Sequence, residues 1–294
     1  MVYDTELGSS AMRVYVVDTF TQNMFRGNPT SVVLVDQPVD PEWMQAVAAE
    51  FNHPATAFAD ISSPDAQPKS LRWFSPTTEL ALCGSGTLAA AHILGGDQTF
   101  QTRGGTLNCA GGSDGAISMR FPTDPPRPEP RTAELVEGLP GMTLCSVWRG
   151  RRDVMVEAAC AAEVRALIPN PAALANIDAR AVIVTAAGDR EADIVSRVFA
   201  PRAGILEDPV TGSAHCTLAS WWSERLPAPE LLAEQASQRG GVLRIRLEGD
   251  HVVLIGHAVT VCSPVLPSHA GASDCLQSLG DRVGERVDFG GIET

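Results

Sequence analysis

Two short segments place small residues at an expected helix start beside side chains that can carry protons. They are residues 83–87 (CGSGT) and residues 208–213 (DPVTGS), and each leads into a run of helix-forming residues. Backbone N–H groups at a helix start lack intrahelical partners and lie at the positive end of the helix dipole. Such a turn can hold a carboxylate or phosphate without a cationic side chain. The alternative is that Ser and Thr only cap the helices.

Four side chains at or near these segments could do acid–base or nucleophilic chemistry. Asp208 could act as a general acid or base, with helix capping as the alternative. Cys83 lies where a helix start would lower a thiol pKa and favour the thiolate, unless it is a buried core cysteine. His215 falls in the first turn of the second helix, where we expect it to be neutral. His53 lies in an expected loop and could equally be a surface histidine.

Neither segment has the pattern of a common cofactor site. A G-x-x-x-x-G-K phosphate loop is absent from the sequence, and Gly84-x-Gly86 lacks the third glycine of a dinucleotide fingerprint. The seven cysteines are scattered and form no C-x-x-C pair, which argues against a regular zinc site and a disulfide framework. The motifs therefore favour none of a phosphate loop, a dinucleotide site or a regularly spaced zinc site.

The composition limits the partners. The chain has 294 residues and a net charge of -13, and all but one of its 22 basic residues are arginine. An acidic chain without a basic run is a poor match to nucleic acids or anionic membranes. No apolar run of about 18 residues suits a membrane helix, and the N-terminus lacks the features of a signal peptide. We expect neither a nucleic acid nor a membrane as a partner, and the scattered cysteines indicate a reducing cytoplasm.

The elements that must position the two segments form a repeated pattern. Alternating, β-branched stretches predict strands over 12–20, 31–36, 55–60 and 71–76, and helical spacing predicts helices over 41–51 and 83–96. The second half has a similar order of strands, a polar turn and a helix. Residues 72–76 (RWFSP) match residues 197–201 (RVFAP) at an offset of 125, which would place Cys83 opposite Asp208. We predict a duplication with one site in the cleft between the halves.

A proline-rich stretch is the best candidate for the boundary between the halves. The predicted division is an N-terminal lobe over residues 1–124, a linker over residues 125–132 and a C-terminal lobe over residues 133–282. Residues 283–294 are a candidate completion of the first lobe.

Several segments together resemble the phenazine-biosynthesis PhzF-like family, which has the diaminopimelate epimerase fold. The similar segments are residues 18–35, 48–58, 71–94, 196–222 and 235–259. The resemblance implies an α+β fold of two pseudo-symmetric β-barrel-like lobes, each around a central helix, with a site between them. It also implies a homodimer without cofactor or metal. Characterised relatives move protons on small carboxylate-bearing molecules.

Only some of the family's functional residues are present in this chain. The family's acidic general base lies in an N-x-S-E-T-x-F segment, which is NHPATAF at residues 52–58 here, so that Ala55 replaces the acid. The histidine of the family's C-G-H-A-T motif is replaced by Ser85. An alanine has no proton to exchange, whereas racemisation by two bases needs one group on each face of the carbon.

The second half matches the family more closely. Asp208, Gly212 and Ser213 match its E-D-P-V-T-G-S-A-H motif, and Cys83 matches the first catalytic thiol of the epimerase relatives. Their second thiol would fall near Pro209, so a mechanism with two cysteines is not available. A one-base proton shift on one face of an unsaturated acid remains open.

We predict a cofactor-independent isomerase that shifts a proton or double bond, or epimerises, on a small carboxylate-bearing, amino-acid-derived metabolite in specialised, antibiotic-type biosynthesis. A binding or scaffold protein that has lost the acid/base is the alternative, and a thiol-dependent enzyme using Cys83 is a third hypothesis. The candidate catalytic residues are Asp208, Cys83, His53 and Ser85. The candidate substrate-binding residues are Asn28, Gly84, Gly86, Thr87, Gly212, Ser213 and His215.

Overall fold

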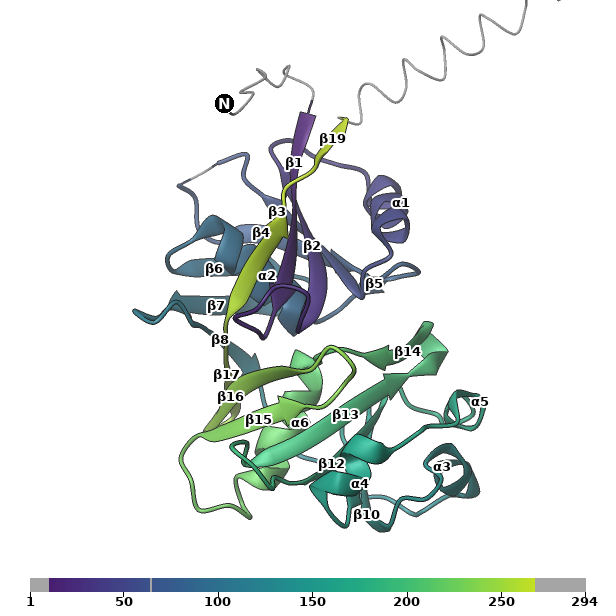
Figure 1. The fold of residues 1–294 in the computed structure, drawn as a ribbon. Helices are drawn as coiled ribbons and strands as arrows, with labels where there is room; N and C mark the ends of the chain where they lie inside the picture. Colours follow the sequence, from purple (N-terminus) through teal and green to yellow (C-terminus); the bar gives the residue numbers. More distant parts are fainter. Residues whose placement is uncertain (1–10, 64, 268–294) are drawn as a thin grey trace, which may run out of the picture.

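The protein is a mixed α/β molecule (Figure 1). In the part of the chain that the structure describes, 19 strands form one hydrogen-bonded network. Its structure, a computed structural model, describes residues 11–63 and 65–267. The predicted completion of the first lobe by residues 283–294 and the cysteine at position 275 lie outside these residues.

The first half contains eight strands and two helices, built largely from the stretches that the sequence pattern indicates. They are β1 (Ala11–Thr19), β2 (Asn28–Val35), α1 (Pro41–Phe51), β3 (Ala55–Asp60), β4 (Lys69–Phe74), β5 (Glu79–Leu80), α2 (Gly84–Leu94), β6 (Gln98–Thr102), β7 (Gly105–Gly111) and β8 (Ile117–Pro122). Helix α1 starts where Asp40 accepts a hydrogen bond from the Glu42 N–H at 2.8 Å, with Pro41 in the first turn. Helix α2 is capped by the Cys83 side chain.

The second half follows the same order with short additional helices. It contains β9 (Arg127–Pro128), α3 (Ala133–Gly138), β10 (Leu144–Arg149), β11 (Val154–Ala158), α4 (Ala161–Ala166), α5 (Pro171–Leu174), β12 (Val182–Ala187), β13 (Ile194–Ala200), the 3-10 turn η1 (Pro201–Ala203), β14 (Ile205–Asp208), α6 (Gly212–Trp222), β15 (Leu231–Gln235), β16 (Gly241–Glu248) and β17 (His251–Gly256). Strands β18 (Ala258–Cys262) and β19 (Val265–Pro267) follow.

The strand pairings show the internal repeat directly. Strand β2 is parallel to β3, β3 antiparallel to β4, and β4 parallel to β6, and the same relations hold for β11, β12, β13 and β15. The repeated arginines also make equivalent contacts. Arg72 pairs with Glu79 and lies over Phe74, and Arg197 pairs with Glu207 and lies over Phe199.

The equivalence of Cys83 and Asp208 that the constant offset predicts is wrong. The connection from the repeated arginine to its glutamate is longer in the second half, where η1 adds three residues. Helices α2 and α6 start at Gly84 and Gly212, so the structural counterpart of Cys83 is Thr211, and that of Asp208 is Leu80. A local insertion of this kind shifts the register after it and is hard to place from one short motif.

Two long stretches of chain belong to both halves. Strand β8 pairs with β17 and continues into β9, which pairs with β10, while β17 continues into β18, which pairs with β1. As a result, the pairings close one circuit through the first-half strands and another through the second-half strands. Helix α2 packs against β1, β2, β3 and β8 of the first circuit, and α6 packs against β16 and β17 of the second.

The predicted boundaries differ from these pairings in two places. Residues 258–267 fall in the predicted C-terminal lobe, but β18 and β19 pair with β1 in the first half. The predicted linker over residues 125–132 contains β9, which pairs with β10. Prolines are tolerated in a short strand of this kind, so a proline-rich stretch need not be a free linker.

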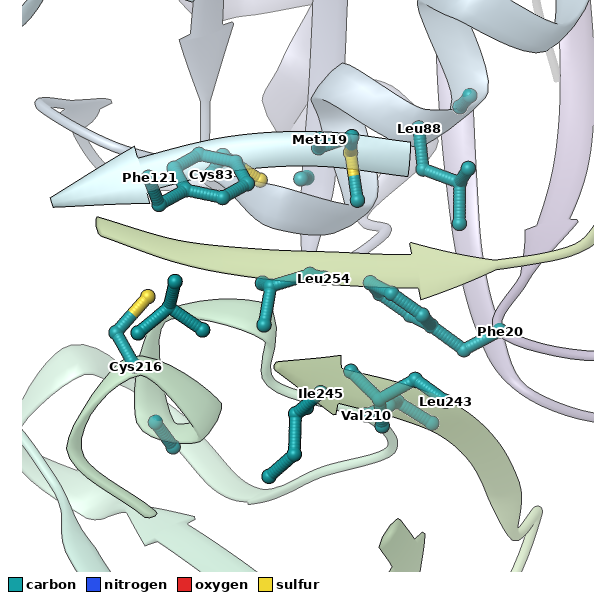
Figure 2. Close-up of a cluster of buried hydrophobic side chains, with 14 of the residues drawn as sticks. Phe20, Cys83, Leu88, Met119, Phe121, Val210, Cys216, Leu243, Ile245 and Leu254 are labelled. Atoms are coloured by element: carbon teal, nitrogen blue, oxygen red, sulfur yellow. The ribbon is translucent and has the colours of Figure 1, made fainter. Parts of the chain in front are cut away.

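A single hydrophobic cluster crosses the boundary between the halves. Figure 2 shows β8 and β17 side by side, with Met119 and Phe121 on β8 and Leu254 on β17. Leu88 of α2 and Cys216 of α6 belong to the same buried cluster. Its apolar residues hold the starts of the two helices in fixed positions.

Candidate active site

The starts of α2 and α6 meet at two glycines. A methyl group added to Gly84 would lie 2.9 Å from the Gly212 Cα, and one added to Gly212 would lie 3.0 Å from the Gly84 Cα. Both residues line a cavity of about 280 Å³ between the halves. Two helix starts therefore direct unpaired backbone N–H groups toward the same space.

Asp208 lines this cavity at the end of β14 and accepts two side-chain hydrogen bonds. Asn28 donates its Nδ2 to Oδ1 at 2.8 Å, and Thr211 donates its Oγ1 to Oδ2 at 2.6 Å. Burial raises the pKa of Asp208 to about 6, against the lowering effects of these two hydrogen bonds. A carboxyl group with this pKa can both accept and release a proton near neutral pH.

Two first-half side chains in the cavity, Cys83 and Ser85, contact each other. The Cys83 Sγ lies 3.4 Å from the Ser85 Oγ and accepts a hydrogen bond from the Gly86 N–H at 3.3 Å. The expected lowering of the Cys83 pKa at the helix start is wrong, because burial raises this pKa despite both hydrogen bonds. Cys83 is therefore a neutral thiol that caps α2.

The protonated state of Cys83 predicts low reactivity toward alkylating reagents. With iodoacetamide at neutral pH, we expect Cys145, Cys160 and Cys262, which are exposed, to react well before Cys83. Peptide mass spectrometry over a time course measures the order of modification. Modification of Cys83 ahead of the exposed cysteines would restore the thiol-dependent mechanism.

Two arginines, Arg152 and Arg180, line the cavity and were missed by the sequence analysis. Arg180 donates its Nε to Asp153 Oδ1 at 2.8 Å and its Nη1 to Ser213 Oγ at 2.9 Å. The backbone N–H of Arg180 donates to the carbonyl of Arg152 at 2.7 Å. Neither arginine belongs to a recognisable sequence motif. They come together because Arg152 precedes β11, Arg180 precedes β12, and these two strands pair in parallel.

Ala55 lines the cavity as the first residue of β3 and is buried. Its counterpart in the second half is Ala181, since Thr56 lies opposite Phe74 and Val182 lies opposite Phe199. Ala181 lines the cavity as well. Neither of these equivalent positions can exchange a proton.

Seven of the predicted site residues line the cavity. They are Asp208, Cys83, Ser85, Asn28, Gly84, Gly212 and Ser213.

Four predicted site residues do not line the cavity. His53 Nδ1 is 2.8 Å from Ser31 Oγ, and burial lowers the pKa of His53. Thr87 is fully buried and donates its Oγ1 to the Cys83 carbonyl at 2.6 Å. Gly86 packs against Trp73, whose Cδ1 would lie 2.4 Å from an added methyl group. His215 is fully buried, and burial lowers its pKa to about 4, consistent with the expected neutral form.

Three of these residues, Gly86, Thr87 and His215, have packing roles that their sequence motif does not distinguish from ligand binding. A helix start presents only part of its first turn to a cavity, and the other side chains of that turn face the core. His53 lies instead in the loop between α1 and β3.

Within residues 11–63 and 65–267, no group of three or more His, Cys, Asp or Glu side chains is arranged to hold a metal ion. None of the helices in the described part of the chain has the length and apolar character to span a membrane.

Comparison with known proteins places the chain in a family. The family model described as phenazine biosynthesis-like protein, PhzC–PhzF, matches residues 17–263. The chain belongs to this phenazine biosynthesis-like family. An uncharacterized isomerase of Halalkalibacterium halodurans is 44% identical over 84% of this chain and 96% of its own length. An uncharacterized isomerase of Pseudomonas aeruginosa is 41% identical over 86% of this chain and 97% of its own length.

Solved structures of the phenazine biosynthesis-like family have the same fold. The PhzF family protein of Enterococcus faecalis superimposes with a TM-score of 0.81 at 33% identity, covering 87% of this chain and 99% of that one. A hydroxyproline epimerase of Agrobacterium vitis superimposes with a TM-score of 0.58 at 10% identity, covering 88% of this chain and 93% of that one. The second comparison extends the fold to epimerases.

Proposed function

We propose that this protein is a cofactor-independent isomerase that moves a proton on a small carboxylate-bearing molecule. The observation that carries the proposal is Asp208, a carboxyl group with a pKa of about 6 in the cavity where the two helix starts meet. Relatives that are 44% and 41% identical are named isomerases, which supports the same class of reaction here.

The proton chemistry acts from one side of the cavity. Asp208 belongs to the second half. Its first-half counterpart is Leu80, which also lines the cavity but has no ionisable group. In a one-base mechanism, the Asp208 carboxylate removes a proton from a carbon next to a double bond, and the electron pair moves across the allylic system. The protonated Asp208 exchanges its proton with solvent and then delivers a proton to the far carbon. The same acid thus serves both steps of a double-bond shift.

The cavity offers hydrogen-bond donors for the negative charge that develops in this reaction. The cavity contains the starts of α2 and α6, and their N–H groups can bind the substrate carboxylate and stabilise an enolate-like intermediate. Ser213, also in the cavity, holds the Arg180 guanidinium at 2.9 Å. These groups account for anion binding by a chain whose net charge is -13.

Deuterium exchange tests the proposal without knowledge of the natural substrate. The protein is incubated in D₂O with a panel of β,γ-unsaturated and amino-acid-derived acids, and the products are analysed by mass spectrometry and NMR. We expect deuterium at carbon and a shifted double bond or inverted centre for at least one acid. Exchange catalysed equally well by the Asp208→Asn variant would contradict the assignment of the base.

A binding protein on the same fold is the second candidate, and Ala55 favours it. This alanine and its counterpart Ala181 both line the cavity, so neither half of the protein supplies an acid at this position. Measurable binding of acids from the panel with no deuterium incorporation would identify the binding protein. The homodimer, the pseudo-symmetric lobes and the role in specialised biosynthesis belong to the proposal as consequences of the resemblance. The cytoplasmic location belongs to it as well, on the ground of the scattered cysteines.

A further inference from the structure

The charged side chains that line the cavity leave one cation uncompensated. Glu79 accepts Arg72 at 2.8 Å and Arg103 at 2.6 Å, so its charge is balanced outside the cavity. Asp208 is the acid/base group of the proposed reaction. The remaining lining charges are the guanidinium groups of Arg152 and Arg180.

These two arginines differ in their partners. Arg180 forms an ion pair with the buried Asp153, which balances its charge. The exposed Arg152 side chain forms no hydrogen bond or ion pair with any group in residues 11–63 and 65–267. A guanidinium is always charged in proteins and matches carboxylate or phosphate with two parallel hydrogen bonds. Arg152 therefore offers an unoccupied anion-binding group at the edge of the cavity.

The internal repeat shows that this cationic wall is specific to the second half. Val33 lies opposite Phe58 in the first half, and Val156 lies opposite Val184 in the second. This register makes Pro29 the counterpart of Arg152, and Pro54 the counterpart of Arg180. The second half thus places two guanidinium groups at positions where the first half has proline, and of these two prolines Pro54 lines the cavity.

Arg180 connects the helix start to Arg152. Its Nη1 donates to Ser213 at the start of α6, and its backbone N–H donates to the Arg152 carbonyl. An acidic group held at the start of α6 would therefore lie near Arg180, and Arg152, which is joined to Arg180 through the backbone, lines the same cavity. A ligand that extends along this wall would meet Arg152 with its distal end.

We propose that the substrate carries two acidic groups, and that Arg152 binds the second one. The inference rests on the proposed function, in which the first carboxylate is bound at the starts of α2 and α6. Arg152 then determines specificity by selecting dianionic over monoanionic acids. The cavity volume of about 280 Å³ is at the lower limit for ligand pockets, so the two acidic groups are a few carbon atoms apart.

Calorimetric titration with short acids tests this proposal. Malonate, succinate and glutarate are compared with propionate, butyrate and valerate, which lack the second carboxylate. We expect at least one dicarboxylate to bind about tenfold or more tightly than its matched monocarboxylate. Arg152→Gln should remove this preference and leave monocarboxylate binding within about twofold. The matched control is Arg190→Gln, because Arg190 is exposed and does not line the cavity.

The possible outcomes decide the proposal. A preference for 3-phosphonopropionate over the dicarboxylates, lost in Arg152→Gln, would make the second group a phosphate. Equal binding of the two series, binding of neither series, or a preference that survives in Arg152→Gln would overturn the proposal. The titration does not depend on turnover, and the Asp208→Asn variant should keep the preference. A dicarboxylate preference without deuterium exchange would therefore refute the isomerase while leaving Arg152 as the second anion-binding group.

Discussion

The Asp208→Asn variant should turn over its substrate at least about 100-fold more slowly than the wild type, because an amide can neither accept nor return the proton. The rate of the wild type should rise with pH through about 6, as burial raises the Asp208 pKa to that value and only the carboxylate removes a proton. The variant should lose this dependence. Deuterium incorporation measured across the pH range follows both effects.

A folding defect can be separated from a chemical one in this experiment. The pKa of Asp208 in the folded protein lies above the ordinary value of 3.8, so the protonated carboxyl group adds to the free energy of unfolding at low pH. This contribution is lost as the pH rises through about 6. Asparagine avoids the buried charge, and the variant should resist urea at neutral pH at least as well as the wild type. Asp250→Asn, at a side chain that is 88% exposed, is the matched control and should change neither property. Unchanged turnover of Asp208→Asn would remove this residue from the mechanism.

The Gly84→Ala variant should be destabilised by about 1–3 kcal/mol and lose most ligand binding, because the new methyl group would meet the backbone of α6. Its nearest neighbour would be the Gly212 Cα at 2.9 Å, and backbone atoms on a packed helix cannot move as the end of a side chain can. Urea denaturation measures the free energy of unfolding, and calorimetric titration with the short acids measures binding.

A second glycine provides the control for this variant. Gly111 is in β7, and an added methyl group there would have its nearest contact at 3.8 Å from the Gly96 carbonyl oxygen. Gly111→Ala should therefore change stability and binding little. Equal effects of the two substitutions would show that the helix starts can separate at low cost and do not fix the shape of the cavity.

The parts of the fold that the sequence predicted are those that depend on local patterns. The repeated R-x-F-x-P segments indicated the duplication, because Arg72 and Arg197 perform the same local task of pairing with a nearby glutamate. The two helix starts were predictable from small residues before an Ala-rich run, and Asp208 followed from the motif that surrounds it. These features involve residues close together in the chain.

The features that were missed or wrongly placed depend on distant parts of the chain. Arg152 and Arg180 meet at the cavity because β11 and β12 are parallel neighbours, a pairing that no local signal marks. The Cys83 pKa depends on how deeply the thiol is buried, and this burial outweighs the effect of the helix start that the sequence reveals. His53 was included for its chemistry alone, and the structure places it beside Ser31 outside the cavity.

The strand shared at the end of the chain has a consequence for how the protein is made. Strand β18 closes the first-half circuit by pairing with β1, and the two strands are separated by most of the polypeptide. During synthesis, the first half leaves the ribosome with an unpaired edge on β1, because its partners β18 and β19 are translated after the whole second half. Contacts of such long range slow folding and leave intermediates open to incorrect pairing. The circuit of first-half strands is therefore closed only after residue 262 has emerged from the ribosome.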